Sequence, residues 1–221
     1  DVVASGGTTD ATIEAAVDTL FTSLKSNGLY SKMLAMYPYV GSTAASHSIN
    51  ALLNKTYDIT WFGGMTHGIS GSTGDGINGY GNTNFGMDDF TNKELSSFGV
   101  YLTQPQTNSS NSRLHGTFGG SRIAFGTNFG GNTYFGFYST PYNSTPPTEQ
   151  TGMYSIVRTG TTEAPVYINE NTTPFTTLTG SYSSAQPTDP VYIFAYNANN
   201  TVLGNSYTND TLGFWYFGES I

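Results

Sequence analysis

The chain has no cysteine, little charge and no long apolar run, and each absence excludes a class of protein. Without cysteine there are no disulfides, thiolate nucleophiles, zinc–sulfur sites or iron–sulfur clusters. Charged residues make up 10% of the 221 residues, and the net charge of −8 disfavours binding to nucleic acid phosphates. No apolar run approaches the ~20 residues that a membrane-spanning helix needs. We therefore expect neither nucleic acid nor a membrane among its partners.

Glycine and aromatic residues are abundant instead. The 16 Tyr and 14 Phe are atypical of a disordered chain. A helical bundle would need more Ala, Leu, Glu, Lys and Arg than accompany the 27 Gly. Short aromatic and β-branched runs recur between turns that are rich in Gly, Asn, Pro, Ser and Thr. This spacing predicts an antiparallel sandwich or barrel rather than alternating strands and helices.

One amphipathic helix is expected before the strands begin. It is expected over 10–26, with Thr9 or Asp10 as its cap and Asn27-Gly28 as its end. Its apolar residues recur at helical spacing: Ile13, Val17, Leu20, Phe21 and Leu24. Residues 1–28 are thus expected to form a lead-in and helix, and residues 29–221 one all-β domain.

The remaining chain is expected to alternate between strands and long polar loops. Residues 30–40 are expected to form a strand, and 43–53 a short helix or an irregular crossing. Further strands are expected at Ile59–Phe62, Ser97–Leu102, Arg122–Phe125, Thr133–Tyr138, Met153–Arg158, Val166–Ile168, Val191–Tyr196 and Leu212–Phe217. The expected loops are 63–84, 103–117, 139–151, 169–189 and 197–211.

The sequence does not indicate a catalytic site. A glycosidase needs two carboxyl groups that face each other across a sugar, and no expected strand alternates Glu and Asp. The histidines, His47, His67 and His115, lack a short metal-ligand spacing, although a site assembled from distant positions stays open. No Gly-x-Ser-x-Gly elbow follows a strand. We therefore expect a protein without enzymatic activity and without a required cofactor.

Two kinds of binding site are candidates in the polar loops. Residues 68–89 are rich in oxygen ligands, and Asp75, Asp88 and Asp89 are candidates for calcium. Turn formation by Asn, Asp and Gly is the alternative explanation of this segment. Aromatic rings among Asn, Asp and Gly also suit sugar binding, because a ring face packs on the apolar face of a pyranose. The candidates for such a surface are Trp61, Tyr80, Tyr142 and Tyr207.

The segment 29–83 resembles a segment of virion proteins of tailed bacteriophages. The motifs are LYSKMLAMYPYVG (29–41), TAASHSINALLN (43–54), FGGMTHG (62–68) and GINGYGNT (76–83), and LGFWYFGES (212–220) resembles the last strand of that family. The resemblance implies a concanavalin A-like (LamG-like) jelly roll of two antiparallel sheets. The positions that match the family pattern, interpreted as turn and core determinants, are His47, Asn50, Thr66, His67, Asn78 and Tyr80.

The function implied by the resemblance is structural or adhesive. We expect a component of a phage virion, such as a tail fibre, head fibre or capsid decoration. Its expected partners are further copies of the same chain, in a homo-oligomer, and other virion proteins. Host-surface polysaccharide is a candidate ligand. A secreted carbohydrate-binding module is the alternative, followed by a glycan-cleaving enzyme. The first residue, Asp1, and the end at Ile221 lead us to expect a processed chain or a fragment.

Overall fold

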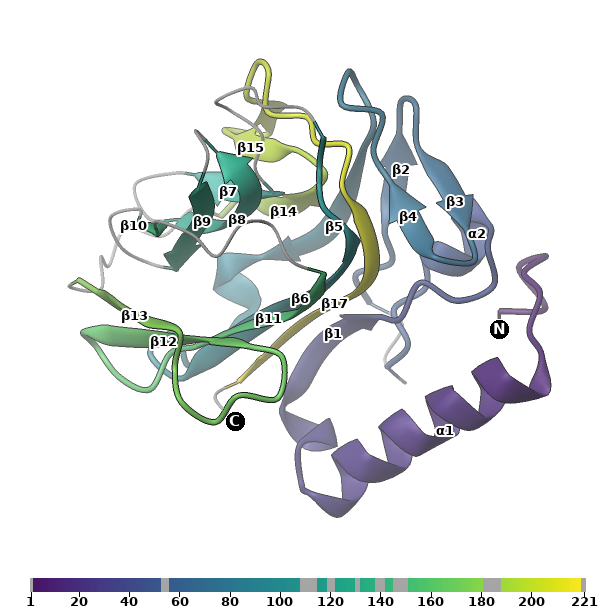
Figure 1. The fold of residues 1–221 in the computed structure, drawn as a ribbon, viewed down its shortest axis with the longest axis horizontal. Coiled ribbons are helices and arrows are strands. Elements are labelled where there is room, and N and C mark those ends of the chain that lie inside the picture. Colours follow the sequence, from purple (N-terminus) through teal and green to yellow (C-terminus); the bar gives the residue numbers. More distant parts are fainter. Residues whose placement is uncertain are drawn as a thin grey trace.

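Two β-sheets packed face to face form the body of the protein, and one long helix lies along its side (Figure 1). The computed structural model describes residues 2–52, 56–107, 115–118, 122–129, 132–137, 142–144, 151–180 and 188–219. The predicted all-β jelly-roll sandwich with an N-terminal helix is confirmed.

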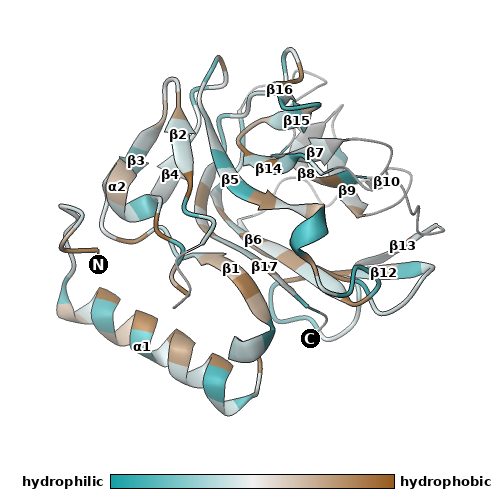
Figure 2. Cartoon of the chain, turned by 180° about the vertical axis from the view of Figure 1, so that it is seen from behind, coloured by the Kyte–Doolittle hydropathy of each residue, from teal (hydrophilic) through white to brown (hydrophobic). Residues whose placement is uncertain are grey.

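The helix α1 (Ala11–Ser26) has the limits that the sequence predicts. The Asp10 carboxylate accepts hydrogen bonds from the backbone N–H groups of Thr12 and Ile13, both at 2.9 Å, which caps the first turn. None of its residues is fully buried. Leu20, Phe21 and Leu24 are half-buried against a small cluster around Met36, Leu52 and Tyr216, on the outer surface of the sandwich. Figure 2 shows the hydrophobic and hydrophilic residues that alternate along this helix.

The first sheet, sheet A, is antiparallel throughout the described residues. Its main path runs β13 (Thr176–Thr179), β12 (Glu163–Ile168), β11 (Gly152–Val157), β6 (Ser96–Gln104), β17 (Thr211–Glu219), β4 (Gly71–Thr73) and β3 (Thr66–Gly68). The strand β1 (Met33–Tyr37) also pairs with β17 and follows the short 3-10 helix η1 (Tyr30–Lys32). The short helix α2 (Ala44–His47) begins at a capping box between Thr43 and Ser46.

The second sheet, sheet B, packs across the core from sheet A. Its main path runs β10 (Tyr142–Ser144), β9 (Asn132–Phe137), β8 (Arg122–Phe129), β7 (His115–Phe118), β14 (Pro190–Ile193), β5 (Tyr80–Gly86) and β2 (Thr60–Phe62). The hairpin of β15 (Tyr196–Ala198) and β16 (Thr201–Val202) joins it through β7. The pairing of β15 with β7 is parallel, whereas the strands along the main path of sheet B pair antiparallel, as the sequence predicts.

The core lies between the sheets and is largely aromatic. Residues two positions apart on a strand share a face, and Phe135 and Phe137 of β9 both belong to the main core, whereas Tyr134 between them belongs to a separate cluster. Phe98 of β6 stacks on Trp215 of β17 with ring centroids 6.0 Å apart, and both side chains are fully buried. Burial of such rings supplies most of the stability of a sandwich without disulfides.

A buried hydrogen-bond network crosses this core. The Asp210 carboxylate accepts hydrogen bonds from the Gln106 N–H at 2.6 Å, the Thr127 hydroxyl at 2.8 Å and His115 Nε2 at 3.0 Å. His115 Nδ1 accepts from the backbone N–H of Phe194 at 2.8 Å, so the ring proton lies on Nε2. Because Asp210 and His115 are completely buried, this pair is part of the core rather than of a ligand site.

Several segments that the sequence predicts as loops contain short strands. Residues 63–84 hold β3, β4 and most of β5, while β7, β10, β13, β15 and β16 lie in or reach into the other expected loops. These strands are rich in Gly, Thr, Asn and Ser, and their pairing partners rather than their own side chains hold them extended. The run Val191–Tyr196 is divided by Phe194, whose φ is +67°. Residues 30–32 are a 3-10 turn rather than the start of the expected strand.

Candidate functional site

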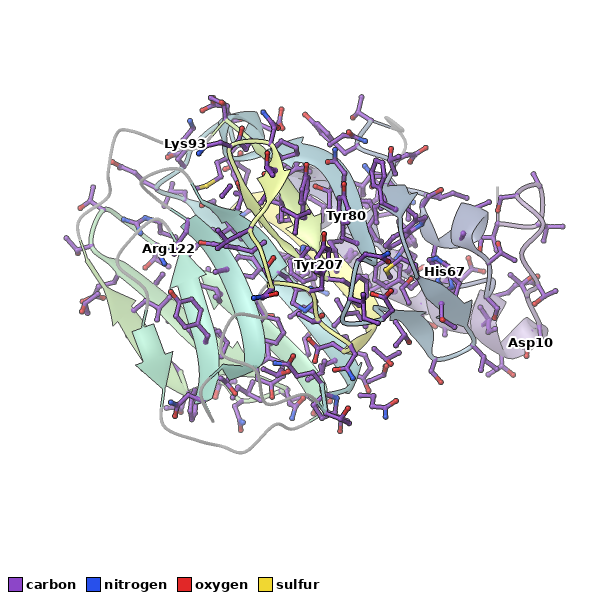
Figure 3. The ribbon with its side chains drawn as sticks, turned by 90° about the horizontal axis from the view of Figure 1, so that it is seen from above. Asp10, His67, Tyr80, Lys93, Arg122 and Tyr207 are labelled. Carbon is purple, nitrogen blue, oxygen red and sulfur yellow. The ribbon has the colours of Figure 1, made fainter. Side chains whose placement is uncertain are left out.

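Four aromatic side chains gather on the outer face of sheet B. We call Phe62, Tyr80, Tyr192 and Tyr207 the aromatic platform. The rings of Phe62 and Tyr80 are stacked, with centroids 4.8 Å apart and 12° between their planes. Tyr80 also lies 4.9 Å from Tyr192 and 6.4 Å from Tyr207, and Figure 3 shows Tyr80 and Tyr207 beside each other. Phe62 is 43% exposed and Tyr80 and Tyr207 are half-buried, whereas Tyr192 is only 6% exposed. The part of the platform that is open to a ligand is therefore formed by Phe62, Tyr80 and Tyr207.

Strand register explains why these rings meet. Phe62 of β2 pairs directly with Tyr80 of β5, and side chains of directly opposite residues lie on one face. Residues two positions apart share a face, so Thr60 and Asn82 also face outward beside the rings. Tyr192 of β14 pairs with Asn82 and extends the same face. The platform therefore combines ring faces with hydroxyl and amide groups.

The hydroxyls of Tyr80 and Tyr192 stay uncharged at neutral pH. Burial raises the pKa of Tyr80, and the nearby Tyr207 raises it further. Burial also raises the pKa of Tyr192, with Tyr80 and Asp189 adding to the effect. These neutral hydroxyls can both donate and accept hydrogen bonds, which is what the hydroxyl groups of a sugar require of a partner.

Trp61 does not belong to the platform, which corrects the sequence-based grouping. Its ring lies on the inner face of β2, 4.8 Å from His67 and 6.1 Å from Tyr39, and its Nε1–H donates to the Ala44 carbonyl at 3.0 Å. Trp61 pairs with Gly81, where a Cβ would lie 2.6 Å from the indole. Tyr142 starts β10, but its side chain lies outside the described residues.

Asp75 shapes the loop between β4 and β5. Its Oδ1 accepts hydrogen bonds from the backbone N–H groups of Ile77, Asn78 and Gly79 at 2.8–2.9 Å. Burial acts to raise the pKa of the Asp75 carboxyl, but these hydrogen bonds outweigh it and the pKa is lowered. Asn78 Oδ1 in turn accepts from the Gly64 N–H at 2.8 Å. Both residues therefore stabilise turns next to the platform.

The candidate calcium ligands are not gathered at one place. Asp75 precedes β5, whereas Asp88 and Asp89 lie in the 3-10 helix η2 (Met87–Asp89) after it. The seven residues of β5 separate the two ends by about 20 Å. Asp88 pairs with Lys93, and Asp89 accepts from the Tyr57 hydroxyl and the Gly86 N–H. One ion cannot bind all three, and the described residues contain no group of three His, Cys, Asp or Glu around a metal position.

The remaining predicted positions have structural contacts. The Asn50 side chain is buried, accepts from the Met36 N–H at 3.0 Å and donates to the Thr56 carbonyl at 2.7 Å, as expected for a core determinant. His47 and His67, 20 residues apart in sequence, lie side by side with their Nδ1 atoms 3.2 Å apart. Sequence spacing could not predict this contact, because it depends on how α2 packs on β3.

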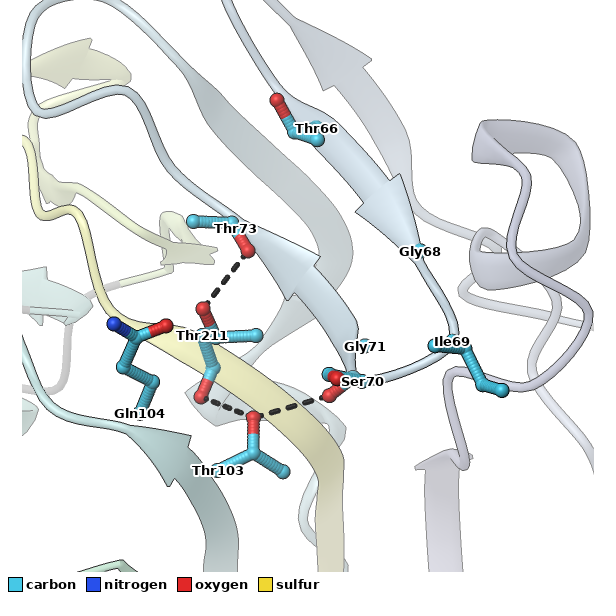
Figure 4. A pocket seen from close by; sticks show the side chains of 9 residues that line it. All are labelled: Thr66, Gly68, Ile69, Ser70, Gly71, Thr73, Thr103, Gln104 and Thr211. Atoms are coloured by element: carbon cyan, nitrogen blue, oxygen red, sulfur yellow. Dashed lines mark hydrogen bonds between the residues drawn. The ribbon is translucent and has the colours of Figure 1, made fainter.

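Thr66 lines a polar groove of about 320 Å³ beside the hairpin of β3 and β4 (Figure 4). The hydroxyls of Thr73 and Thr211 lie 2.9 Å apart, and Thr103 Oγ1 lies 3.0 Å from the carbonyls of Ser70 and of Thr211. Three hydroxyls are therefore engaged within the protein. The groove also lacks an aromatic ring, so the platform is the stronger candidate for ligand binding.

Sequence reasoning missed Phe62 and Tyr192 as partners of Tyr80 and Tyr207. Alternation along 59–62 places Trp61 and Phe62 on opposite faces, and this signal was available. Which face looks outward depends on the register with β5, which the sequence does not contain.

Comparisons with known proteins bear on the fold alone. No protein-family model matches the chain, and no curated protein matches it. Among solved structures, the chain is similar to a mutant of HCR/D, with a TM-score of 0.52 and 10% sequence identity. The match covers 87% of this chain and 49% of that one, so this chain spans about half the length of that structure.

In the described part of the chain, no helix is long and apolar enough to cross a membrane.

Proposed function

We propose that this protein is a non-enzymatic component of a tailed-bacteriophage virion that binds host-surface glycans through the aromatic platform. The observation that carries the binding role is the stacked pair of Phe62 and Tyr80, with Tyr207 beside it, on an open face of sheet B. Exposed stacked rings offer an apolar surface to the C–H face of a pyranose. The virion role rests on the resemblance of residues 29–83 to a segment of phage virion proteins. In the virion, copies of the chain would assemble with one another and with other virion proteins.

The carboxylates near the platform favour binding without hydrolysis. Glycoside hydrolysis needs two carboxyl groups on opposite sides of a sugar. Asp75 is engaged by three backbone N–H groups, and Asp89 by Tyr57 and Gly86. Asp189 influences Tyr192 and is available as a hydrogen-bond acceptor for a sugar hydroxyl.

An array of bacterial surface polysaccharides and their oligosaccharide fragments tests the binding role. We expect the wild-type protein to bind a subset of them and Tyr80→Ala to lose about tenfold in affinity, which corresponds to about 1.4 kcal/mol. Tyr101→Ala is the control, because Tyr101 is a tyrosine on the surface of β6 in the other sheet, with the same 43% exposed fraction as Phe62. Equal losses in both variants, or no binding by the wild type, would contradict the role. New reducing ends in the bound glycan would instead indicate an enzyme.

Labelling of purified phage particles with an antibody against the protein tests the virion role separately. Antibody bound at a fixed position of the particle supports it, as does a defined oligomer of the isolated protein in light scattering. Glycan binding by a protein that is absent from particles would indicate the secreted carbohydrate-binding module instead.

A further inference from the structure

Two histidines and one serine form a compact hydrogen-bonded group behind the aromatic platform. His47 comes from α2, His67 from β3 and Ser72 from β4. Ser72 Oγ lies 2.9 Å from His47 Nδ1 and 3.1 Å from His67 Nδ1, and the two nitrogens are 3.2 Å apart. Ser72 and His47 are buried, whereas His67 is half-buried. The position of His67 is marked in Figure 3.

The positions of the protons follow from the unpaired ring nitrogen of His47. Its Nε2 is buried and has no hydrogen-bond partner among the described residues. An orphaned buried N–H is rarer in proteins than an acceptor that lacks a donor, so the proton of neutral His47 lies on Nδ1. His47 Nδ1–H then donates to Ser72 Oγ, and the Ser72 hydroxyl donates to His67 Nδ1. The proton of His67 consequently lies on Nε2.

We propose that His47, Ser72 and His67 form an acid-sensitive latch that holds the β3–β4 hairpin against α2 at neutral pH and releases it when a histidine is protonated. A proton on His67 Nδ1 turns this nitrogen from an acceptor into a donor, so the Ser72 hydroxyl loses its acceptor. Ser72 Oγ has lone pairs for both N–H groups, but these two N–H groups then also point towards each other, because their nitrogens are only 3.2 Å apart. This opposition, together with the new charge, weakens the contact between α2 and the hairpin.

The surroundings of the two rings do not compensate a positive charge. Among the described residues, neither imidazole has a hydrogen bond or ion pair with a carboxylate. The titratable group that packs on His47 from the segment after β1 is Tyr39, at 5.6 Å between ring centroids, and burial raises its pKa so that it stays neutral. Trp61 of β2 packs on His67. Burial lowers the pKa of both histidines, and His67 lowers the pKa of His47 further.

The hairpin is the part of sheet A that such a change can release. In the described residues β3 pairs only with β4, and β4 pairs with β17 through Thr73 and Ser72 alone. Side chains add the contact of Thr73 with Thr211 and the hydrogen bond from Thr103 to the Ser70 carbonyl, which hold β4 and the turn. The latch is the hydrogen-bonded contact between the hairpin and α2, and few backbone pairs oppose its release. Release of the hairpin would expose Trp61.

Nitrogen NMR of the imidazole side chains, recorded together with backbone hydrogen exchange, tests the latch. The chain has three histidines, so their signals are readily assigned. We expect His47 to carry its proton on Nδ1 and His67 and His115 on Nε2 at pH 7.5. After correction for intrinsic exchange rates, we expect protection of the 66–73 amides to fall about tenfold or more between pH 7 and pH 4.5, while protection in β6 and β17 persists.

The variant His67→Asn separates the latch from general acid destabilisation. The Asn carbonyl oxygen can accept from Ser72 but does not titrate, so the hairpin should keep its protection at pH 4.5. Thr66→Asn, at the exposed neighbouring position of β3, is the control and should behave as the wild type. If His67→Asn does not fold, Ser72→Ala, in which the hairpin should already be unprotected at pH 7, takes its place.

Three outcomes would overturn the proposal. The first is constant protection of the wild-type hairpin down to pH 4.5, and the second is an unchanged acid response in His67→Asn. The third is a melting temperature at pH 7.5 that falls when a chelator is added, because a metal ion between the two Nδ1 atoms would then replace the hydrogen-bonded chain.

Discussion

Phe62 and Tyr80 lie in adjacent strands as a directly paired couple, and their rings are nearly parallel at 4.8 Å. Cross-strand aromatic pairs commonly stabilise sheets. Here Phe62 keeps 43% of its surface exposed. An apolar ring left open beside neutral tyrosine hydroxyls is the arrangement on which the proposed glycan binding depends.

The ring of Tyr80, rather than its hydroxyl, is expected to carry glycan affinity. Tyr80→Phe keeps the stack with Phe62 and should change affinity by no more than about threefold, whereas Tyr80→Ala should reduce it about tenfold. Isothermal titration with one oligosaccharide from the array compares the two variants. Equal losses of affinity in the two variants would show that the Tyr80 hydroxyl, and not the stacked ring, carries the glycan affinity.

Gly81 is expected to be essential for stability because Trp61 occupies the space above it. A Cβ at position 81 would lie 2.6 Å from the indole and 2.8 Å from Ile59. Gly81→Ala should lower the free energy of unfolding by about 1–3 kcal/mol, as overpacking does. Urea denaturation measures this change. Gly160→Ala is the control, since a Cβ there meets no atom within 4 Å; similar losses in both variants would show that packing against Trp61 is not the cause.

The buried Asp210 is expected to be one of the most sensitive positions of the core. Asp210→Asn removes the charge that accepts from Gln106, Thr127 and His115, so we expect a loss of about 3 kcal/mol or more. The exposed Asp88, paired with Lys93, provides the control, and Asp88→Asn should change stability by less than about 1 kcal/mol. Chemical denaturation measures the stability of both variants. An Asp210→Asn variant as stable as the wild type would contradict the account.

Stability is expected to fall as the pH drops from 6.5 towards 4. Burial, with a smaller contribution from His67, lowers the pKa of His47 from 6.5 to about 4. The unfolded chain therefore binds a proton in this range that the folded chain does not, so unfolding becomes easier in acid. The shift corresponds to no more than about 3 kcal/mol. Denaturation curves at pH 7.5 and 4.5 measure it, and His47→Asn should show a smaller difference between the two pH values than the wild type.

The fold was more predictable than the site. The helix over 10–26 was predictable because capping residues and apolar periodicity are local signals, and Asp10 caps α1 as expected. Aromatic runs such as 212–217 marked the long central strands. The strands β3, β4 and β5 escaped prediction because their Gly, Thr, Ser and Asn residues are typical of loops. Only pairing with a neighbour identifies such segments as strands.

The candidate site depended on long-range register. Tyr80 and Tyr207 were identified from their polar surroundings, and the structure brings them together. Trp61 has similar neighbours in sequence but faces inward, where Gly81 leaves room for its ring. The contact between His47 and His67 likewise joins residues from α2 and β3. Neither arrangement follows from spacing along the chain.

The most direct test of the central claim is an NMR titration of the protein, labelled with ¹³C in its Tyr and Phe rings, with the oligosaccharide that binds best on the array. The account predicts that the ring signals of Tyr80, Phe62 and Tyr207 shift together and saturate, while that of Tyr101 stays unchanged. Shifts confined to rings outside the platform, or no shift of Tyr80 under saturating ligand, would contradict glycan binding at this surface.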